Sequence, residues 1–262
     1  MDTRMAEIDA VFLDLDGTMY LGGELIPGAI EFLTRCEQHG VSRFFLSNNS
    51  SRSVNQCVSK LRGLGIPATV EDVLLSTHDL LSWLGANGVT ETWLVGTEGM
   101  REMLEGQGIS TQSKNPEYVV LGYDTEISYD KIATASIHMR SGVPMVASHP
   151  DMVCPSPDGG LPDAGAYMAM FEAATGVRPV HVCGKPEPSM ILHKMEALGL
   201  EPGRCAMVGD RLYTDMAMAT RAGVQGILVL SGEATEEDVA ALPEGAEQIP
   251  TLIVGSVDEL LR

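Results

Sequence analysis

Short apolar runs alternate with helix-like stretches along most of the chain. An almost continuous apolar run from Ala10 to Asp14 is followed by a polar turn, and residues 27–40 then show the spacing of an amphipathic helix. The same succession of strand, polar loop and helix returns at residues 43–47 and 53–64. Apolar runs without alternation are typical of strands buried on both faces. The pattern predicts an α/β fold with a Rossmann-like, doubly wound parallel sheet.

A second α/β unit is expected between residues 79 and 179, where strands and helices again alternate. The expected strands are 93–95, 118–121 and 145–147, and the expected helices are 98–105, 129–141 and 164–175. Residues 148–163 form a long loop dense in Pro and Gly, and loops of that length within a compact domain usually carry a function or mark a boundary.

The last third of the chain places polar residues at the ends of two further apolar runs. The strand-like run 180–183 leads to Lys185, and the run 205–209 leads to Asp210, with Asp215 at the start of the next helix. Apolar runs at 227–230 and 252–254 are expected to complete the sheet.

The turn after the first strand carries two carboxylates, Asp14 and Asp16, followed by Gly17. Open α/β sheets bind ligands at the carboxyl ends of their strands, and Gly allows the backbone to turn sharply there. A calcium-binding EF-hand loop is excluded by spacing, because Met19 and Leu25 stand where that loop needs Gly and Glu. The turn therefore suits a metal ion and a phosphoryl group.

Charge narrows the classes of ligand. The 262 residues include 36 Asp and Glu but only 17 Lys and Arg, a net charge of −19, which argues against nucleic acid or an anionic membrane as partner. A phosphate ligand would need a bound cation and a Lys to reverse the local sign. The five cysteines never form a C-x-x-C pair, and most are expected to be reduced core residues. No apolar run approaches the length of a membrane span, and a cytoplasmic protein is expected.

The polar residues at the strand ends are expected to meet in one crevice, since parallel strands present their carboxyl ends at one edge of a sheet. Four loops contribute to this set: Asp14, Asp16 and Thr18; Ser47 and Asn48; Lys185; and Asp210 and Asp215.

The motifs D-x-D-G-T, S-N-N, G-K-P and G-D-x-x-x-x-D, in this order, resemble those of the haloacid dehalogenase (HAD) superfamily, and within it subfamily IIA, the NagD-like phosphatases. The resemblance implies a discontinuous core domain, residues 1–78 and 180–262. This core would be interrupted by an inserted α/β cap domain of class C2, subtype A, residues 79–179.

The resemblance also implies a role for each residue of the set. Asp14 would be the nucleophile and Asp16 the general acid and base. Mg²⁺ would be held by Asp14, the backbone carbonyl of Asp16 and Asp210. Ser47, Asn48 and Lys185 would bind the phosphate of the substrate. Asp215 and Thr18 would lie behind the residues that contact the substrate or the metal ion and would orient them.

The expected activity is that of a hydrolase: a Mg²⁺-dependent phosphatase that acts on small phosphorylated metabolites through an aspartyl-phosphate. Sugar phosphates and nucleoside monophosphates are the expected substrates, and p-nitrophenyl phosphate the expected substrate in vitro. Two alternatives share the motifs, a phosphomutase and a non-catalytic phosphometabolite-binding protein. Asp16 favours hydrolysis over the ATPases of the superfamily, which lack an acid at that position.

The cap is expected to choose the substrate and to exclude macromolecules. Its candidate contacts with the non-phosphate half of the substrate are Tyr123, Asp124, Asp151 and Asp163. In the long loop, His149, Asp151 and Asp163 are expected to be exposed, although turn chemistry alone would also account for them. No nucleic acid or membrane partner is expected, and a homodimer through the cap is a further hypothesis.

Overall fold

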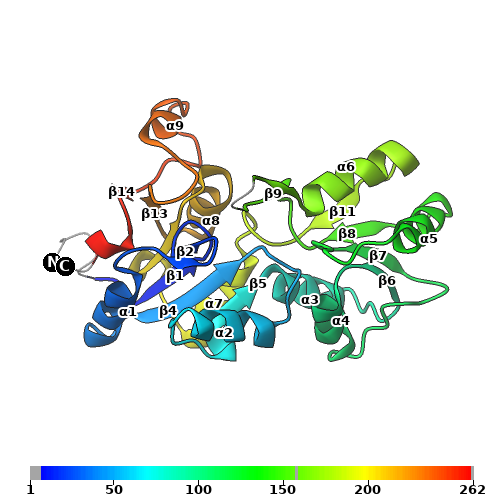
Figure 1. Ribbon diagram of the computed structural model, residues 1–262, viewed down its shortest axis with the longest axis horizontal. Helices are drawn as coiled ribbons and strands as arrows, with labels where there is room; N and C mark the ends of the chain where they lie inside the picture. Colours follow the sequence, from blue (N-terminus) through cyan, green and yellow to red (C-terminus); the bar gives the residue numbers. More distant parts are fainter. Residues whose placement is uncertain (1–6, 157–158, 261–262) are drawn as a thin grey trace. The chain divides into compact units, whose positions relative to one another are not determined.

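The computed structural model describes residues 7–156 and 159–260, and the chain divides into two compact units. The first, here called the core, comprises Met1–Leu46, Val58–Leu74 and Lys185–Arg262; the second, here called the cap, comprises Ser47–Cys57 and Leu75–Gly184. Each unit has a sheet with helices around it, which confirms the predicted α/β class (Figure 1).

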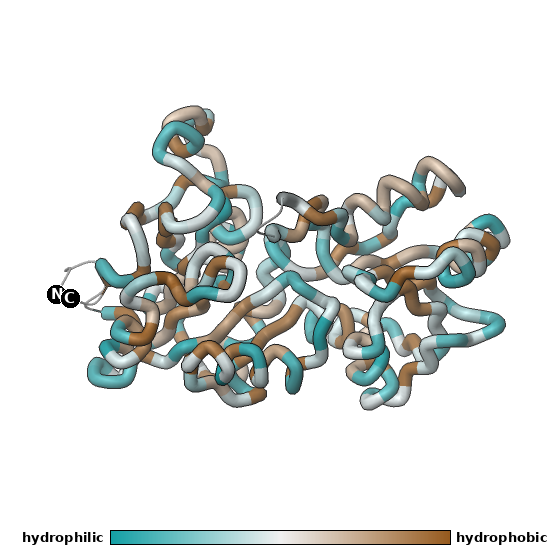
Figure 2. Tube along the Cα trace, viewed as in Figure 1, coloured by the Kyte–Doolittle hydropathy of each residue, from teal (hydrophilic) through white to brown (hydrophobic). Residues whose placement is uncertain are grey.

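The core sheet has six strands in the order β14-β13-β12-β1-β4-β5. Every residue of β1 is buried, and β1 pairs in parallel with β12 on one side and β4 on the other. Hydrophobic segments follow these central strands in Figure 2. The bounds are β1 Ala10–Asp14, β4 Ser42–Ser47, β5 Val73–Leu75, β12 Cys205–Gly209, β13 Gln225–Val229 and β14 Leu252–Val254.

One face of the core sheet is packed by α7 and α8. Met190 and Met195 of α7 and Met218 of α8 lie in one buried cluster with Phe12 and Phe44 of the strands. The remaining elements of this part of the chain are the helices and a small antiparallel hairpin: α1 Ala29–Gln38, α2 Val54–Gly63, α7 Ser189–Leu198, α8 Ala217–Ala222, α9 Glu236–Ala240, β2 Tyr20–Leu21 and β3 Glu24–Leu25.

The cap sheet has four parallel strands in the order β11-β8-β7-β6. Residues of α3 and α4 are clustered with one face of this sheet, and residues of α5 and α6 with the other (Figure 1). The long loop contains a hairpin, β9–β10, that the sequence did not predict. The bounds are α3 Ser76–Ala86, β6 Thr92–Val95, α4 Glu98–Glu105, β7 Tyr118–Leu121, α5 Tyr129–Arg140, β8 Met145–Ala147, β9 Val153–Cys154, β10 Leu161–Pro162, α6 Ala164–Thr175 and β11 Pro179–Val182.

One strand lies in a different sheet from the one expected. The run before Lys185 was predicted to join the core sheet, but β11 pairs with β8 of the cap. The prediction was wrong because a run of four mostly apolar residues can pair with any parallel strand. The local sequence pattern does not indicate which strand will be its neighbour. The domain boundaries at residues 79 and 179 stay a prediction; the two compact units divide at residues 75 and 184, and residues 47–57 lie with the cap.

Within residues 7–156 and 159–260, no helix has the length and apolar character needed to cross a membrane.

Candidate active site

The first carboxylates of the site are positioned by β1. Asp14 is the last residue of this central strand and is paired in register with Leu46 of β4. Asp16 follows in the turn, where the Tyr20 hydroxyl donates a hydrogen bond to its Oδ2 at 3.2 Å. Thr18 is fully buried, and among the described residues its hydroxyl oxygen has no hydrogen-bond partner. The strand thus delivers two carboxylates to the carboxyl edge of the core sheet, as the sequence predicts.

Lys185 lies between two of the predicted site carboxylates. Its ammonium forms a close ion pair with Asp14, and a second with Asp215, whose Oδ1 lies 2.7 Å from Nζ. The second carboxylate oxygen of Asp215 accepts a hydrogen bond from the backbone N–H of Arg211 at 3.1 Å. All three side chains are buried, so the pairs are only weakly screened by water.

Asp210 completes the carboxylate cluster. One oxygen of each of Asp14, Asp210 and Asp215 lies within 4.8 Å of those of the other two. Burial raises the pKa of Asp210, and the negative charges of Asp14 and Asp215 raise it further. For Lys185, burial lowers the pKa, but Asp14 and Asp215 outweigh this and raise it, so the ammonium stays charged.

Three glycines make room for these carboxylates. A Cβ on Gly17 would lie 2.3 Å from Oδ2 of Asp210, and one on Gly232 would lie 2.0 Å from the same atom. A Cβ on Gly209 would lie 2.3 Å from Oδ2 of Asp215. Gly17 also has a φ of +88°, a backbone conformation that L side chains rarely adopt. The backbone therefore approaches the carboxylates more closely than any other residue type would permit.

This cluster fits a magnesium ion. Three ionised carboxylates and one ammonium would leave two negative charges in a buried place, and a dication would balance them and keep Asp210 ionised. Oδ2 of Asp210 accepts the backbone N–H of Glu233 at 2.8 Å, but within the described part of the chain Oδ1 has no hydrogen-bond partner. A buried carboxylate oxygen without a donor is suited to bind a hard cation, for which oxygen ligands are preferred. Asp14 and Asp210 are accordingly the side chains that would hold Mg²⁺.

Ser47 and Asn48 are located where β4 ends. Ser47 follows Leu46, the residue paired with Asp14, and its hydroxyl accepts the backbone N–H of Asn49 at 3.2 Å. The carboxamide of Asn48 donates to Oδ1 of Asp151 at 3.0 Å, and its backbone carbonyl accepts the Ser76 hydroxyl at 2.7 Å. Both side chains are buried, and their phosphate-binding roles stay predictions.

Two of the predicted substrate contacts, Tyr123 and Asp124, are buried in the cap. Asp124 is fully buried and pairs with Lys131 at 2.9 Å. Tyr123 is 5% exposed; burial raises the pKa of its hydroxyl, as do the neighbouring Cys154 and Asp163. Their contact with a substrate stays a prediction.

The three polar residues expected to be exposed in the long loop are buried instead, which corrects that prediction. His149 is fully buried, and Asp151 and Asp163 are 9% and 3% exposed. Asp163 also accepts the backbone N–H of Ala164 at the start of α6. The loop sequence looked like turn chemistry because its partners are distant in the chain; Asn48, for example, precedes Asp151 by 103 residues. Pro157 and Asp158 of this loop lie outside the described residues.

Comparison with known proteins identifies the family of the chain. The profile of haloacid dehalogenase-like hydrolases matches residues 11–110, and that of HAD-hydrolase-like proteins matches residues 182–260. An acid sugar phosphatase of Staphylococcus aureus is 34% identical over 239 residues, which cover 90% of this chain and 91% of the relative. The chain belongs to the haloacid dehalogenase-like hydrolases. The family predicted from the motifs is thereby confirmed.

Solved structures extend the likeness to the whole fold. A 4-nitrophenylphosphatase of Thermotoga maritima is 38% identical with a TM-score of 0.91, covering 98% of each chain. NagD of Escherichia coli K-12 is 26% identical with a TM-score of 0.86, covering 97% of this chain and 98% of that one. A glycerol phosphate phosphatase of Mycobacterium tuberculosis crystallised with magnesium is 31% identical with a TM-score of 0.89, covering 98% of this chain and 78% of that one.

The glycine cradle predicts a selective loss of activity. We expect Gly17→Ala to lower kcat by about a hundredfold or more, because the added Cβ displaces Asp210 and a shift of about 1 Å in a catalytic group has such an effect. Gly40→Ala is the matched control, since Gly40 also has a positive φ, +69°, but has nothing within 4 Å of the added Cβ. Both variants carry the backbone strain of about 1–2 kcal/mol, which thermal unfolding measures. An equal loss of kcat in the two variants would show that strain, not the contact with Asp210, is responsible.

Proposed function

We propose that this protein is a Mg²⁺-dependent phosphomonoesterase that works through an aspartyl-phosphate on Asp14. The observation that carries the proposal is the buried cluster at the end of β1, where Asp14 is held by Lys185 and lies within 4.8 Å of Asp210. A carboxylate held against an ammonium and beside a metal ligand is placed to act as nucleophile on a phosphoryl group.

In the first step, an oxygen of Asp14 attacks the phosphorus atom, and the bond between phosphorus and the ester oxygen breaks. Asp16 donates its proton to the departing alkoxide, so that the product leaves as a neutral alcohol. Asp16 is half-buried and bonded to the Tyr20 hydroxyl, which holds its carboxyl group in one orientation two residues after the nucleophile.

In the second step, Asp16 takes a proton from water, and the resulting hydroxide attacks the phosphorus of the aspartyl-phosphate. The acyl-phosphate bond breaks, Asp14 is restored as a carboxylate, and inorganic phosphate leaves. The same group serves first as acid and then as base, which leaves it ready for the next cycle.

Negative charge on the transferring phosphoryl oxygens is stabilised by Lys185, Ser47 and Asn48 in this proposal. Asp215 positions the Lys185 ammonium through the 2.7 Å ion pair. Mg²⁺, held by Asp14 and Asp210, would supply further positive charge to stabilise the phosphoryl group. Without Lys185 and the ion, an anionic substrate would meet a site with an excess of carboxylates.

The proposed substrates are small phosphomonoesters, sugar phosphates above all. The relatives support this class, because they include an acid sugar phosphatase and a glycerol phosphate phosphatase. Nucleoside monophosphates are the second candidate class. The proposal also includes three hypotheses: cap residues select the substrate, the protein is cytoplasmic, and it forms a homodimer through the cap.

We expect Asp14→Asn to lower the hydrolysis of p-nitrophenyl phosphate by more than about a thousandfold, because the carboxamide cannot form the covalent intermediate. EDTA should inactivate the wild-type protein and Mg²⁺ should restore it. The matched control is Asp130→Asn, an exposed Asp of α5, which should keep full activity. Acid quenching with labelled substrate should trap phosphoprotein in the wild type and none in Asp14→Asn; substantial turnover by Asp14→Asn would refute the covalent mechanism.

We expect Asp16→Ala to lower kcat on an alkyl phosphate by about 10²–10⁴-fold, the usual range for loss of a general acid or base. The loss should be smaller on p-nitrophenyl phosphate, because nitrophenolate leaves without protonation. The measurement is kcat on both substrates for the wild type and the variant. Equal losses would remove the assignment of Asp16 as the acid.

We expect a screen of phosphorylated metabolites to find the highest kcat/KM among sugar phosphates or nucleoside monophosphates. Tyr123→Phe and Asp151→Asn should change the ranking of substrates, whereas Tyr129→Phe, at a residue 82% exposed, should not. Turnover of phosphopeptides with none of small phosphomonoesters would contradict the proposed substrate class. An unchanged ranking in the two buried-site variants would show that these residues do not select the substrate.

A further inference from the structure

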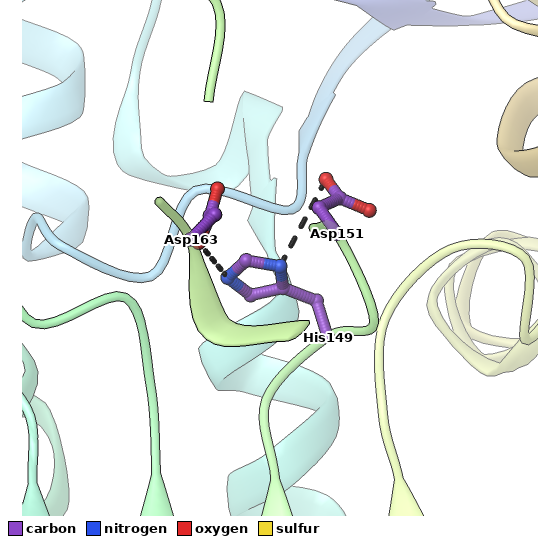
Figure 3. Close-up of side chains that lie close together, drawn as sticks. All are labelled: His149, Asp151 and Asp163. Atoms are coloured by element: carbon purple, nitrogen blue, oxygen red, sulfur yellow. Dashed lines mark ion pairs between the residues drawn. The ribbon is translucent and has the colours of Figure 1, made fainter. Parts of the chain in front are cut away.

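A second cluster of possible metal ligands lies within the cap. His149 comes two residues after β8, Asp151 follows it, and Asp163 precedes α6, with the hairpin β9–β10 in the chain between the two carboxylates. One donor atom of each of the three side chains lies within 4.8 Å of those of the other two. Figure 3 shows the imidazole of His149 between the two carboxylates, with one ring nitrogen toward each.

The imidazole lacks the hydrogen bonds that a buried histidine ordinarily makes. His149 is fully buried, yet neither Nδ1 nor Nε2 has a hydrogen-bond partner among the described residues. The carboxylate oxygens that face them lie at 3.8 Å for Asp151 and 3.5 Å for Asp163, beyond the usual hydrogen-bond range of about 2.7–3.2 Å. A fully buried ring with two unsatisfied nitrogens costs free energy unless another group binds it.

The spacing of the three donor atoms, all within 4.8 Å of one another, suits ligands that close around one ion. Two donors bound at about 2.1 Å to a tetrahedral ion lie about 3.4 Å apart. Only one ring nitrogen can bind the ion, so one of the two nitrogen–oxygen separations, 3.5 Å to Asp163 or 3.8 Å to Asp151, is a separation between two ligand atoms, and either is close to this value.

Charge points to a cation as well. Asp151 accepts a hydrogen bond from the carboxamide of Asn48, and Asp163 accepts one from the backbone of Ala164. Both of these donors are neutral, and two carboxylates buried within 4.8 Å of each other repel. A dication would offset both charges and satisfy one imidazole nitrogen at the same time.

We propose that His149, Asp151 and Asp163 form a second divalent-cation site, which takes a transition-metal ion of the Zn²⁺ class. The imidazole nitrogen sets this site apart from the all-oxygen cluster around Asp210, because nitrogen ligands favour Zn²⁺ over Mg²⁺. The ion would tie the two ends of the loop 148–163 together. Through Asp151 it would also orient Asn48, a consequence that rests on the proposed function.

The test measures bound zinc directly. Protein stripped with a chelator is dialysed against buffered Zn²⁺, and bound zinc is determined by mass spectrometry together with the melting temperature. Asp210→Asn, which disables the core cluster, should retain one tight equivalent of Zn²⁺ and a zinc-dependent rise in melting temperature. His149→Ala and Asp163→Asn in the same background should raise the Kd for Zn²⁺ by at least about tenfold and lose the rise.

The variants allow folding and binding to be separated. Asn at position 163 still caps α6, so Asp163→Asn should fold even where His149→Ala does not. His193→Ala, at an exposed histidine, and Cys154→Ser should keep the zinc affinity of Asp210→Asn. Unchanged zinc binding in both His149→Ala and Asp163→Asn, loss of it in Cys154→Ser alone, or no zinc bound by Asp210→Asn would each overturn the proposal. None of these readouts uses activity, so a failure here leaves the proposed function untouched.

Discussion

Repulsion among three buried carboxylates is the constraint on which the core depends. Asp14, Asp210 and Asp215 are brought within 4.8 Å of one another by the ends of β1 and β12 and by the helical segment Leu212–Met216 that follows β12. Lys185 offsets part of this charge through its ion pairs with Asp14 and Asp215, and no apolar replacement would do so. The excess of negative charge that remains is the physical reason for a bound dication. The same negative charge that favours a metal ion would repel a phosphate, so phosphate binding at this site would depend on metal binding.

The same constraint explains the small residues around the cluster. Gly17, Gly209 and Gly232 leave no space for a Cβ between the backbone and the carboxylates of Asp210 and Asp215. A carboxylate enclosed by backbone in this way has few rotamers available, so its oxygens are fixed before any ion or substrate arrives. Part of the organisation of the site is thus achieved by the shape of the backbone and not by further side chains.

The sequence predicted the strands and the polar residues that follow them, but it did not predict which segments pair over long distances in the chain. The strand of five residues that ends in Asp14 and the apolar run before Asp210 were predicted because burial on both faces and Gly-containing turns leave a local pattern. The sheet to which β11 belongs could not be predicted, because the sequence of a four-residue strand does not indicate which strand it pairs with. The burial of His149 was missed for a related reason: Pro and Gly around it indicated an exposed turn, while its carboxylate neighbours and the hairpin β9–β10 arise only from tertiary structure.

The chain buries carboxylates in two places and balances them with different groups. In the core the partner is a Lys, a permanent cation whose pKa is raised by its two carboxylates, and the remaining donors are all oxygen. In the cap the partner is an imidazole, which is neutral unless protonated and can act as a ligand. The first arrangement suits a hard ion that exchanges with substrate and water, and the second suits a softer ion held in a closed site. Because the two donor sets differ, the two sites would differ in their preference between Mg²⁺ and Zn²⁺.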